Sequence, residues 1–559
     1  MDGVPRGEIF VRLGVRPKTG TLVGLGAVLL LTLATRLPFI PEHLYSFDSV
    51  NLALALQEFS PSRHQPQPPG YPLFVAEARL IYRLVGTPER TFTIIKILIS
   101  SLSVMLLYLL GKRMFSGWVG ISAAGLFFVN PVFWYAGLTS SLRLHLALLS
   151  IVAAYFCWRA SSGEPRYLYA ASCVVGLGSG FRPELLLFLL PLWLWTAGHC
   201  RSKRLFVAGL LLLLIGTLSW VFPLVVVYGG WEPMISSFRE YVLEQSQSAM
   251  ALAGTGVEWR RMVGRAFLWN GLGVLPWIWT IPLTWRYRNR FSDWKRQLLF
   301  LALWFFPPFF FHLLVHIGAP GHALVSIPAL CLVGGLCTIE AQGILTDRHA
   351  ARSNPIGPVI WLALAGNAIL FCWPYAMPQR KEVTAFRGWA SIRDAVTVGT
   401  FETSLRRARY VEETTKMALE QIEVLTSDSD RPVVLVWNRD AVPVWRKVAY
   451  YAPCQPLYET AGRRTQQPRA RVWVGTKMVT ALSGSPSAKL PVPKKGRVIW
   501  LVHPDALSDL AQAVPLWGAF PAYYTDLDED SVPFDWGSFE FIPDERWDAR
   551  HNLRCWPAP

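Results

Sequence analysis

Long apolar runs, separated by short polar connections, fill the first two thirds of the chain. About 20 consecutive apolar residues are needed for a helix to cross the hydrocarbon core of a bilayer. The pattern therefore predicts about eleven membrane-spanning helices in a mainly α-helical, polytopic protein. They are expected near residues 20–40, 94–111, 118–137, 142–158, 167–181, 184–197, 205–228, 268–285, 297–316, 322–341 and 357–376.

Composition agrees with a polytopic membrane protein. The 559 residues are 52% hydrophobic and only 16% charged, which excludes an ordinary soluble enzyme and a disordered chain. The formal net charge is +16, and almost all of the basic excess precedes residue 377. Basic residues in loops between apolar segments are typical of membrane topology, so we expect a lipid bilayer and no nucleic acid as a partner.

The basic residues also predict the orientation of the chain, because short cytoplasmic loops are enriched in Lys and Arg. With a cytoplasmic N-terminus, the inward-facing loops are those near 112, 159–166, 201–204, 286–296 and 348–352. Residues 1–376 then form a multi-pass domain whose long loops 41–93 and 229–267 face outward. Residues 377–559 form an extracytoplasmic domain, and the compact loops favour a bacterial inner membrane.

One apolar stretch has two interpretations. Residues 167–195 form either two short helices that are split at Arg182 and Pro183 or one long helix. A single helix would place the basic residues 199–204 outside and reverse every later loop. The charge pattern favours the short hairpin, with Arg182 at its outer tip.

The polar tail predicts a small α/β domain. Residues 408–426 have helical periodicity with charges on one face. Short β-branched runs follow at 432–437, 471–475 and 497–503. Strands that alternate with helical material favour a partly parallel sheet with helices packed on it. Outside the cytoplasm, Cys454 and Cys555 either form a disulfide or remain free thiols, and the sequence leaves both open.

The outward loop 41–93 carries the most informative polar residues. By residue type alone, Asp48 or Ser49 is the N-cap of a helix that lies on the outer membrane surface. Further along, the sequence Pro-Pro-Gly-Tyr-Pro-Leu at 68–73 fixes the backbone through its prolines and permits a sharp turn at Gly70.

These features resemble the GT-C superfamily of integral-membrane glycosyltransferases. Arg36 ends the first span, Asp48 follows in the first outer loop, and a helix precedes the Pro-Pro-Gly-Tyr-Pro-Leu motif. The sequence is most similar to the branch related to protein O-mannosyltransferases, whose first loop carries an aspartate and an H-P-P-G-Y-P-L-like signature. Gln67 stands where that signature has histidine, and His64 lies close by.

The resemblance implies inverting transfer of a hexosyl or pentosyl group on the extracytoplasmic side. The donor would be a polyprenyl-phosphate-linked sugar, and the acceptor a glycan, lipid or protein. The family's loop aspartate, which acts as general base or orients the acceptor, maps onto Asp48. Such a carboxylate can take the proton of an attacking hydroxyl, and cations can stabilise the charge that develops on the leaving phosphate.

Candidate ligands of the donor phosphate are the cationic side chains at the predicted outer ends of spans. They are Arg36, Arg143, His145, Arg182, His316 and His322. The residues expected around the acceptor are His64, Gln67, Gly70, Tyr71 and Glu184. The alternative for each arginine is that it only extends its charged group into interfacial water. The alternative for the histidines is packing at the interface.

One position departs from the family pattern. Many relatives have an acidic residue near the start of the fourth span, where residues 139–143 contain none. A second carboxylate would then come from Glu42, Glu58 or Glu184. His312 and His316 lie one helical turn apart, but a histidine pair without a third ligand is weak evidence for a metal site. Dependence on a divalent metal stays open.

Two other classes of function remain open. A transporter or flippase of lipid-linked sugars would carry ionisable residues near the bilayer midplane and inverted repeats, whereas the ionisable residues here lie at the outer ends of spans. A non-catalytic membrane scaffold, whose tail binds a partner, is compatible with the missing acidic residue. Turnover of a polyprenyl-phosphate sugar distinguishes the transferase from both.

Overall fold

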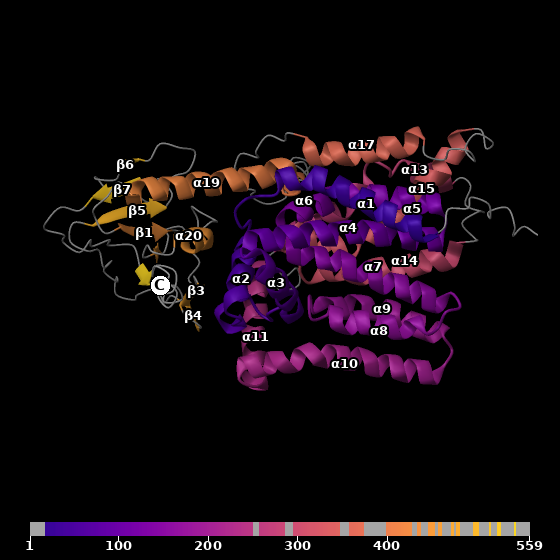
Figure 1. Ribbon diagram of the computed structural model, residues 1–559, viewed down its shortest axis with the longest axis horizontal. Helices are drawn as coiled ribbons and strands as arrows, with labels where there is room; N and C mark the ends of the chain where they lie inside the picture. Colours follow the sequence, from indigo (N-terminus) through magenta and orange to yellow (C-terminus); the bar gives the residue numbers. More distant parts are fainter. Residues whose placement is uncertain are drawn as a thin grey trace, which may run out of the picture.

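The computed structural model shows a bundle of long helices with a mixed β-sheet beside one of its ends (Figure 1). It describes residues 17–249, 256–285, 294–346, 357–373, 398–427, 433–437, 445–452, 457–460, 471–474, 477–480, 496–501, 514–515, 523–526 and 541–543. Cys454 and Cys555 lie outside these ranges, so their pairing stays a prediction.

Most helices of the bundle run along a common direction (Figure 1). They are α1 (Pro17–Arg36), α4 (Pro88–Met114), α5 (Gly117–Phe128), α7 (Ser141–Ser161), α8 (Tyr167–Gly178), α9 (Glu184–His199), α10 (Lys203–Tyr228), α14 (Lys295–Leu314), α15 (Ile327–Leu345) and α17 (Pro358–Cys372). The short helix α6 (Pro131–Thr139) is bent away from the direction of α5. At the end nearest the sheet lie α2 (Phe47–Gln57), α3 (Pro72–Val85) and α11 (Trp231–Ala249). The remaining helices of the bundle are α12 (Gly256–Gly271) and α13 (Thr280–Trp285).

The predicted fold class, a polytopic α-helical membrane protein, is confirmed. Among the described residues, five helices are long and apolar enough to cross a membrane: α4, α7, α10, α14 and α15. The pair α5 and α6 would make a sixth span, bent by 56° where Asn130 caps α6. Shorter apolar helices are Gly24–Phe39, α8, α9 and α17.

The structure differs from the span prediction in one segment and decides between the two interpretations of another. The segment predicted as one helix near 268–285 is divided between the end of α12, a 3-10 turn at Leu272–Val274, and α13. Gly271, Gly273 and Pro276 explain the break, because glycine and proline disfavour a helix interior. The stretch 167–195 contains two helices, α8 and α9, as the hairpin interpretation predicts.

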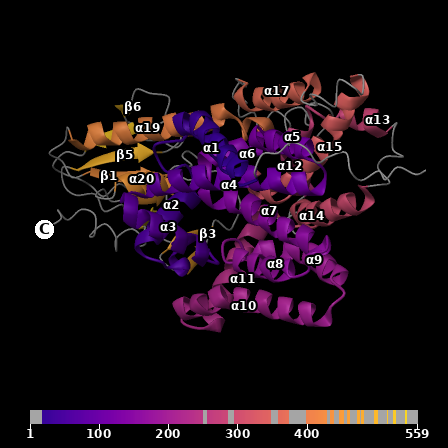
Figure 2. The same ribbon diagram turned by 45° about the vertical axis from the view of Figure 1, so that its right-hand side comes forward.

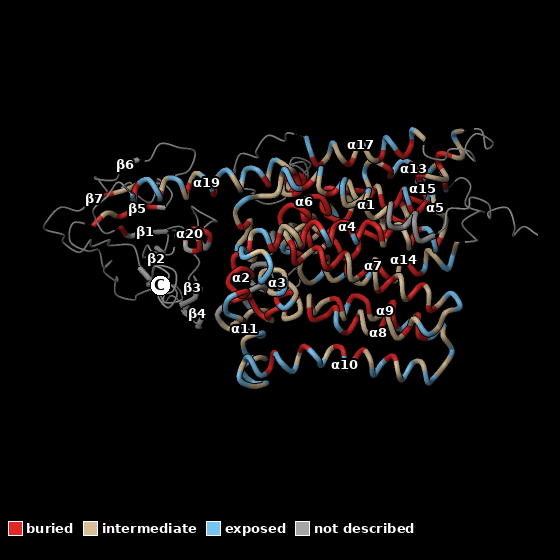
Figure 3. The backbone as a smooth tube through the Cα atoms, in the orientation of Figure 1, coloured by how far each residue is buried: buried red, intermediate tan, exposed pale blue. Residues whose placement is uncertain are grey.

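Glycines allow neighbouring helices to approach closely. A Cβ atom at Gly176 of α8 would lie 2.5 Å from the carbonyl oxygen of Leu213 of α10. Small residues at such contacts let the helix backbones pack closely. Close packing stabilises the association of membrane helices, because lipid offers no hydrophobic driving force. Many positions of α10 are exposed (Figure 3), and those that are apolar suit a lipid-facing surface. These include Leu211, Ile215, Leu218 and Phe222.

The tail contains two helices, α19 (Leu405–Ser427) and α20 (Trp445–Tyr451), and a six-stranded sheet of order β6-β7-β5-β1-β2-β8. Strand β1 (Val433–Trp437) pairs in parallel with β5 (Arg497–Leu501) and β2 (Leu457–Thr460). The outer pairs are antiparallel and involve β6 (Val514–Pro515), β7 (Tyr523–Asp526) and β8 (Phe541–Pro543). The run predicted at 471–475 is β3 (Arg471–Val474), which among the described strands pairs with β4 (Lys477–Thr480) alone, in a separate hairpin.

The tail packs against the loop that precedes α2, and both views place α20 beside α2 (Figures 1 and 2). His43 Nδ1 lies 2.7 Å from Glu412 Oε1 of α19. The backbone N–H of Leu44 donates to the Tyr451 hydroxyl (2.8 Å), which donates to Glu89 Oε1 of α4 (2.8 Å). The tail is therefore fixed to the end of the bundle that carries α2.

The opposite end of the bundle gathers basic residues. Glu164 forms ion pairs with Arg113, at the end of α4, and with Arg159, at the end of α7. Arg296, at the start of α14, donates to the Ser161 carbonyl. These contacts place three of the predicted inward-facing loops at one end of the molecule.

Candidate active site

Asp48 lies in the first turn of α2 without capping it. The N-cap is Ser46, whose Oγ accepts a hydrogen bond from the backbone N–H of Ser49 (3.2 Å). The prediction that Asp48 or Ser49 caps this helix is therefore wrong. A carboxylate in the first turn is favourable because of the helix dipole, and here it extends toward another helix instead of binding its own backbone.

Arg143, at the start of α7, is the partner of this carboxylate. Its Nη2 lies 2.9 Å from Asp48 Oδ2, while the Asp48 side chain remains 36% exposed. Gly321, in the 3-10 helix Pro320–Val325, provides the space, because a Cβ atom there would lie 2.6 Å from Arg143 Cδ. The site thus combines an accessible carboxylate with a guanidinium that orients it.

The turn before α3 brings in a second guanidinium. Gly70 has a φ of +114°, and a Cβ atom there would lie 2.7 Å from Pro61 Cγ, so a larger residue does not fit. Tyr71 adopts the left-handed region (φ 46°), which is uncommon and strained for a bulky residue. This backbone path places the Tyr71 ring under Arg182, whose Cζ lies 5.1 Å from the ring centre.

Charged groups surround the Tyr71 hydroxyl. Burial raises the pKa of Tyr71 to about 12, while Arg182 and Arg143 lower it and Glu184 and Asp48 raise it. The hydroxyl therefore stays protonated at neutral pH and can donate a hydrogen bond. Arg182 is itself buried, and its Nε lies 2.7 Å from Glu184 Oε1.

Three histidines border the same cations. The ring centre of His322 lies 6.3 Å from that of His312 and 5.6 Å from that of His316. His322 Nδ1 accepts a hydrogen bond from a backbone N–H of the preceding loop (3.2 Å), so the neutral ring carries its hydrogen on Nε2. Burial, together with the charges of Arg143 and Arg182, holds the pKa of His322 well below its ordinary value. The neutral ring therefore offers one N–H donor.

The carboxylate, the phenol, the two guanidinium groups and the neutral imidazole form one cluster, made by Asp48, Tyr71, Arg143, Arg182 and His322. Such a set can bind an anion next to a proton acceptor. Within the described part of the chain, no three His, Cys, Asp or Glu side chains are arranged to hold a metal ion.

Comparison with known proteins identifies the type of fold. Residues 66–225 match the sequence model of the family described as dolichyl-phosphate-mannose-protein mannosyltransferase. The crystal structure of ArnT from Cupriavidus metallidurans bound to undecaprenyl phosphate aligns with 91% of this chain and 97% of its own, with a TM-score of 0.51 and 14% identity. The chain has a GT-C-type fold.

Two further structures are similar. The apo state of the same ArnT aligns with 91% of this chain and 98% of its own, with a TM-score of 0.52 and 14% identity. The apo oligosaccharyltransferase of Archaeoglobus fulgidus aligns with 63% of this chain and 56% of its own, with a TM-score of 0.37 and 13% identity. No curated protein matches the sequence. The predicted resemblance to the GT-C superfamily is confirmed by the family match and the shared fold.

The region of the family match begins at the proline-rich loop of this GT-C-type fold, after Asp48. Gln67 is buried there, and its Oε1 accepts a hydrogen bond from Asn51 Nδ2 (3.2 Å), which braces the loop against α2. His64 adopts the left-handed region (φ 57°) and packs edge-to-face against Tyr241 of α11, with ring centres 6.2 Å apart. Both side chains therefore shape the loop beside the cluster.

Arg36, a predicted phosphate ligand, is enclosed by the bundle. Its side chain has no exposed surface. The guanidinium donates to the Phe128 carbonyl and to Thr35 Oγ1, and its Cζ lies 4.0 Å and 4.7 Å from the ring centres of Phe128 and Trp134. These contacts join α1 to α5 and α6.

His145, another predicted phosphate ligand, is also buried, and it has an acidic neighbour that the sequence analysis missed. Its Nδ1 lies 3.0 Å from the Ser141 carbonyl, and its Nε2 lies 2.8 Å from Glu77 Oε2 of α3. The ring stacks on Phe181 with a centre distance of 4.9 Å. Glu77 is the one acidic residue of α3, and the sequence does not reveal its partner.

Proposed function

We propose that this chain is a membrane glycosyltransferase that moves one sugar, with inversion, from a polyprenyl-phosphate-linked donor to a glycan, lipid or protein acceptor. The observation that carries the proposal is the partly exposed Asp48 carboxylate, which pairs with the Arg143 guanidinium (2.9 Å). The shared fold with ArnT adds support, because that protein was crystallised with undecaprenyl phosphate.

In this proposal Asp48 acts as general base. Its carboxylate accepts the proton of the acceptor hydroxyl while the hydroxyl oxygen attacks the anomeric carbon of the donor. The bond between that carbon and the phosphate oxygen breaks, and polyprenyl phosphate leaves with the bonding electrons. Attack from the side opposite the leaving group inverts the anomeric configuration.

The cations of the cluster bind the donor phosphate. A guanidinium has five N–H donors, so Arg143 and Arg182 can keep their carboxylate partners and still donate to phosphate oxygens. The Nε2–H of His322 adds a neutral donor, and His316 lies next to it. These donors stabilise the charge that develops on the leaving phosphate. Arg36 and His145 act at a distance, by fixing helix positions.

The loop residues define the acceptor side in this proposal. The Tyr71 hydroxyl donates a hydrogen bond to the acceptor, and Glu184 holds Arg182 in place. Gln67, His64 and Gly70 keep the turn in the shape that presents Tyr71.

The reaction takes place outside the cytoplasm in this proposal, in a bacterial inner membrane with a cytoplasmic N-terminus. Arg113, Arg159 and Arg296 lie together at the end of α4 and α7 that is opposite to Arg143. Because basic residues are enriched on the cytoplasmic side, Asp48 and the tail face outward.

The test measures transfer of labelled sugar from polyprenyl-phosphate sugars to membrane extracts by the purified full-length protein. Asp48→Asn keeps the size of the side chain but cannot accept the proton, so transfer should fall by about 10²–10⁴-fold. The control is Glu232→Gln, an exposed acid on α11, which should keep wild-type transfer. Full transfer by Asp48→Asn would remove Asp48 from the mechanism. Translocation of the donor lipid without turnover by the wild type would instead indicate a flippase.

A further inference from the structure

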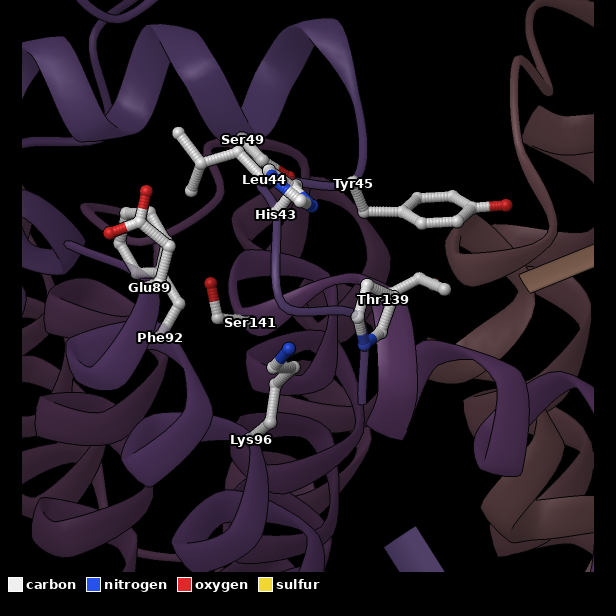
Figure 4. A pocket seen from close by; sticks show the side chains of 10 residues that line it. His43, Leu44, Tyr45, Ser49, Glu89, Phe92, Lys96, Thr139 and Ser141 are labelled. Carbon is white, nitrogen blue, oxygen red and sulfur yellow. The ribbon is translucent and has the colours of Figure 1, made fainter. Parts of the chain in front are cut away.

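The segment that precedes α2 determines where Asp48 lies. Asp48 follows the N-cap residue Ser46 by two positions, in the first turn of the helix. The direction of a side chain in a helix is set by the direction of the helix backbone. The path of the chain into α2 therefore sets the direction of the carboxylate. Residues 43–45 form this entry segment (Figure 4).

Two consecutive backbone N–H groups of the entry segment donate to side chains of the tail. The N–H of His43 donates to Glu412 Oε1 (3.3 Å), and the N–H of Leu44 donates to the Tyr451 hydroxyl (2.8 Å). Leu44 is only 4% exposed, and a buried backbone N–H without a partner costs as much free energy as a lost hydrogen bond. The tail thus fixes the path into α2 from positions 369 and 407 residues away in the chain.

The Tyr451 hydroxyl connects three parts of the molecule. It accepts a hydrogen bond from Leu44 of the entry segment and donates one to Glu89 Oε1 in the first turn of α4 (2.8 Å). Burial, and next the charge of Glu89, raise the pKa of Tyr451. The hydroxyl therefore keeps its hydrogen and acts as donor and acceptor at once. Its ring packs edge-to-face against His43, with ring centres 5.1 Å apart, which holds the hydroxyl in this direction.

The other side of the entry segment contacts the bundle. Figure 4 shows the Tyr45 ring directed away from Glu89. The Tyr45 hydroxyl lies 2.7 Å from the Tyr135 hydroxyl of α6. Lys447 of α20, one helical turn before Tyr451, has its Nζ 5.6 Å from the centre of the Tyr45 ring. The entry segment is therefore held between α20 of the tail and α6 of the bundle.

Another contact attaches the tail without reaching α2. Arg265 Nη2 of α12 lies 3.3 Å from Glu402 Oε1, just before α19. Loss of the Tyr451 hydroxyl therefore leaves the tail attached to the bundle. What it removes is the partner of one buried N–H in the entry segment.

We propose that Tyr451 is a positioning residue for sugar transfer, which fixes the start of α2 through Leu44 and so directs the Asp48 carboxylate. The proposal rests on the proposed role of Asp48 as general base. An error of about 1 Å in the position of a catalytic group can lower a rate by about 10²-fold. The tail is then part of the transferase machinery, although Tyr451 acts through the backbone and not on the substrate.

The first test compares kcat and KM for transfer by the full-length protein in lipid nanodiscs. Tyr451→Phe keeps the ring and removes the hydroxyl. One lost hydrogen bond in the entry segment should lower kcat by about tenfold. KM for the donor should stay within about twofold of wild type, because the cations assigned to the donor phosphate lie outside α2. The control, Tyr410→Phe, removes a hydroxyl from an exposed position of α19 and should change neither constant.

A double-mutant cycle separates positioning from general stabilisation. If Tyr451 acts through Asp48, adding Tyr451→Phe to Asp48→Asn should lower the remaining transfer by less than about twofold. A contact that only stabilises the fold would lower transfer by the same factor in both backgrounds. That result would overturn the proposal.

Hydrogen exchange measures the entry segment without turnover. In Tyr451→Phe, the peptide that contains residues 44–50 should exchange about tenfold faster than in wild type. The peptide that contains β1, elsewhere in the tail, should keep its wild-type rate. Unchanged exchange at residues 44–50, or an equal increase in both peptides, would also overturn the proposal.

Two variants on the bundle side decide the question if Tyr451→Phe does not fold. Glu89→Leu removes the acceptor of the Tyr451 hydroxyl without changing the tail, so it should lower kcat and leave KM unchanged. Glu89→Gln keeps an oxygen that accepts the hydrogen bond, and it should keep wild-type transfer. Equal kcat values for the two Glu89 variants would contradict the positioning role.

The transferase proposal is judged separately. Full transfer by Asp48→Asn would remove Asp48 as the base and, with it, the positioning role of Tyr451 in transfer. Wild-type kcat and exchange in Tyr451→Phe, together with strongly reduced transfer by Asp48→Asn, would remove the role of Tyr451 alone.

Discussion

The Asp48 carboxylate of α2 lies 2.9 Å from the Arg143 guanidinium of α7, and the two residues are 95 positions apart in the chain. The side chains remain 36% and 19% exposed, respectively. A partly exposed ion pair contributes little to stability. Its value is geometric, because Arg143 fixes the direction of the carboxylate and keeps a cation next to the place where a phosphate would leave.

Replacing Arg143 should therefore impair transfer more than folding. Arg143→Met removes one donor to the developing phosphate charge, and kcat should fall by about 10²–10³-fold. Arg143→Lys keeps the charge but loses the forked geometry, so its loss should be smaller. Steady-state transfer from a polyprenyl-phosphate sugar, with thermal unfolding as a check on folding, measures both. The control, Arg239→Met, changes an exposed arginine of α11. An equal loss in both Met variants would contradict the assigned role.

The turn at Gly70 should tolerate no side chain. Gly70 and Gly86 both have positive φ, +114° and +77°, but a Cβ atom at Gly70 would also lie 2.7 Å from Pro61 Cγ, whereas one at Gly86 meets open space. Gly86→Ala should cost about 1 kcal/mol of stability from backbone strain alone. Gly70→Ala adds overpacking, so its total loss should be about 2–4 kcal/mol. Thermal unfolding in detergent measures the loss of stability in each variant. Equal losses would show that Pro61 can move away from the added methyl group without a loss of stability.

Local sequence predicted the elements around the site better than their contacts. The polar residues before α2 predict the start of a helix, and the motif at 68–73 predicts a turn. Both are present in the structure. Which polar residue becomes the N-cap depends on the other hydrogen-bond partners that lie near each candidate side chain. Ser46 takes the cap because the Asp48 carboxylate is directed to Arg143, whose distance in sequence hides it from local reasoning.

The contacts of buried polar residues could not be predicted from the sequence either. From the sequence, Arg36 is predicted to be a cation at the end of a span. Its contacts with Phe128 and Trp134 depend on how the helices pack, which the hydrophobic periodicity does not specify. Lys96 is an isolated lysine in an apolar helix, and the sequence does not reveal its partner, the Leu138 carbonyl. In the tail, β3 has the composition of a sheet strand, yet its short connection to β4 makes a hairpin the nearest partner.

The contact between the tail and the first outer loop should weaken as pH rises. The hydrogen bond that the His43 ring donates to Glu412 raises the pKa of His43, and burial lowers it. Glu412 and Glu42 also attract the protonated ring, and Lys447 repels it. A folded pKa above the unfolded value of about 6.5 means that this stabilisation is complete below pH 6.5 and is lost as pH rises through the folded pKa. Between pH 6 and pH 8, wild type should therefore lose more thermal stability than His43→Gln.

Two variants check that this slope belongs to the pair. Glu412→Gln should flatten it as His43→Gln does, whereas Glu413→Gln, an exposed neighbour on α19, should keep it. A wild-type slope that survives in both His43→Gln and Glu412→Gln would assign the pH dependence elsewhere.

Lys447 should make the tail less stable at neutral pH than at high pH. Burial lowers the pKa of Lys447 to about 7, although Nζ donates to Thr415 Oγ1 (2.9 Å). Because the unfolded pKa is about 10.4, the unfolded state binds the proton more tightly, and stability falls as pH decreases from about 10 to 7. Lys447→Met removes this penalty, so its gain in unfolding temperature over wild type should be largest at pH 7 and shrink toward pH 10. The control, Lys416→Met, changes an exposed position of α19 and should show no such trend. A gain for Lys447→Met that does not vary with pH would contradict the lowered pKa of the buried Lys447.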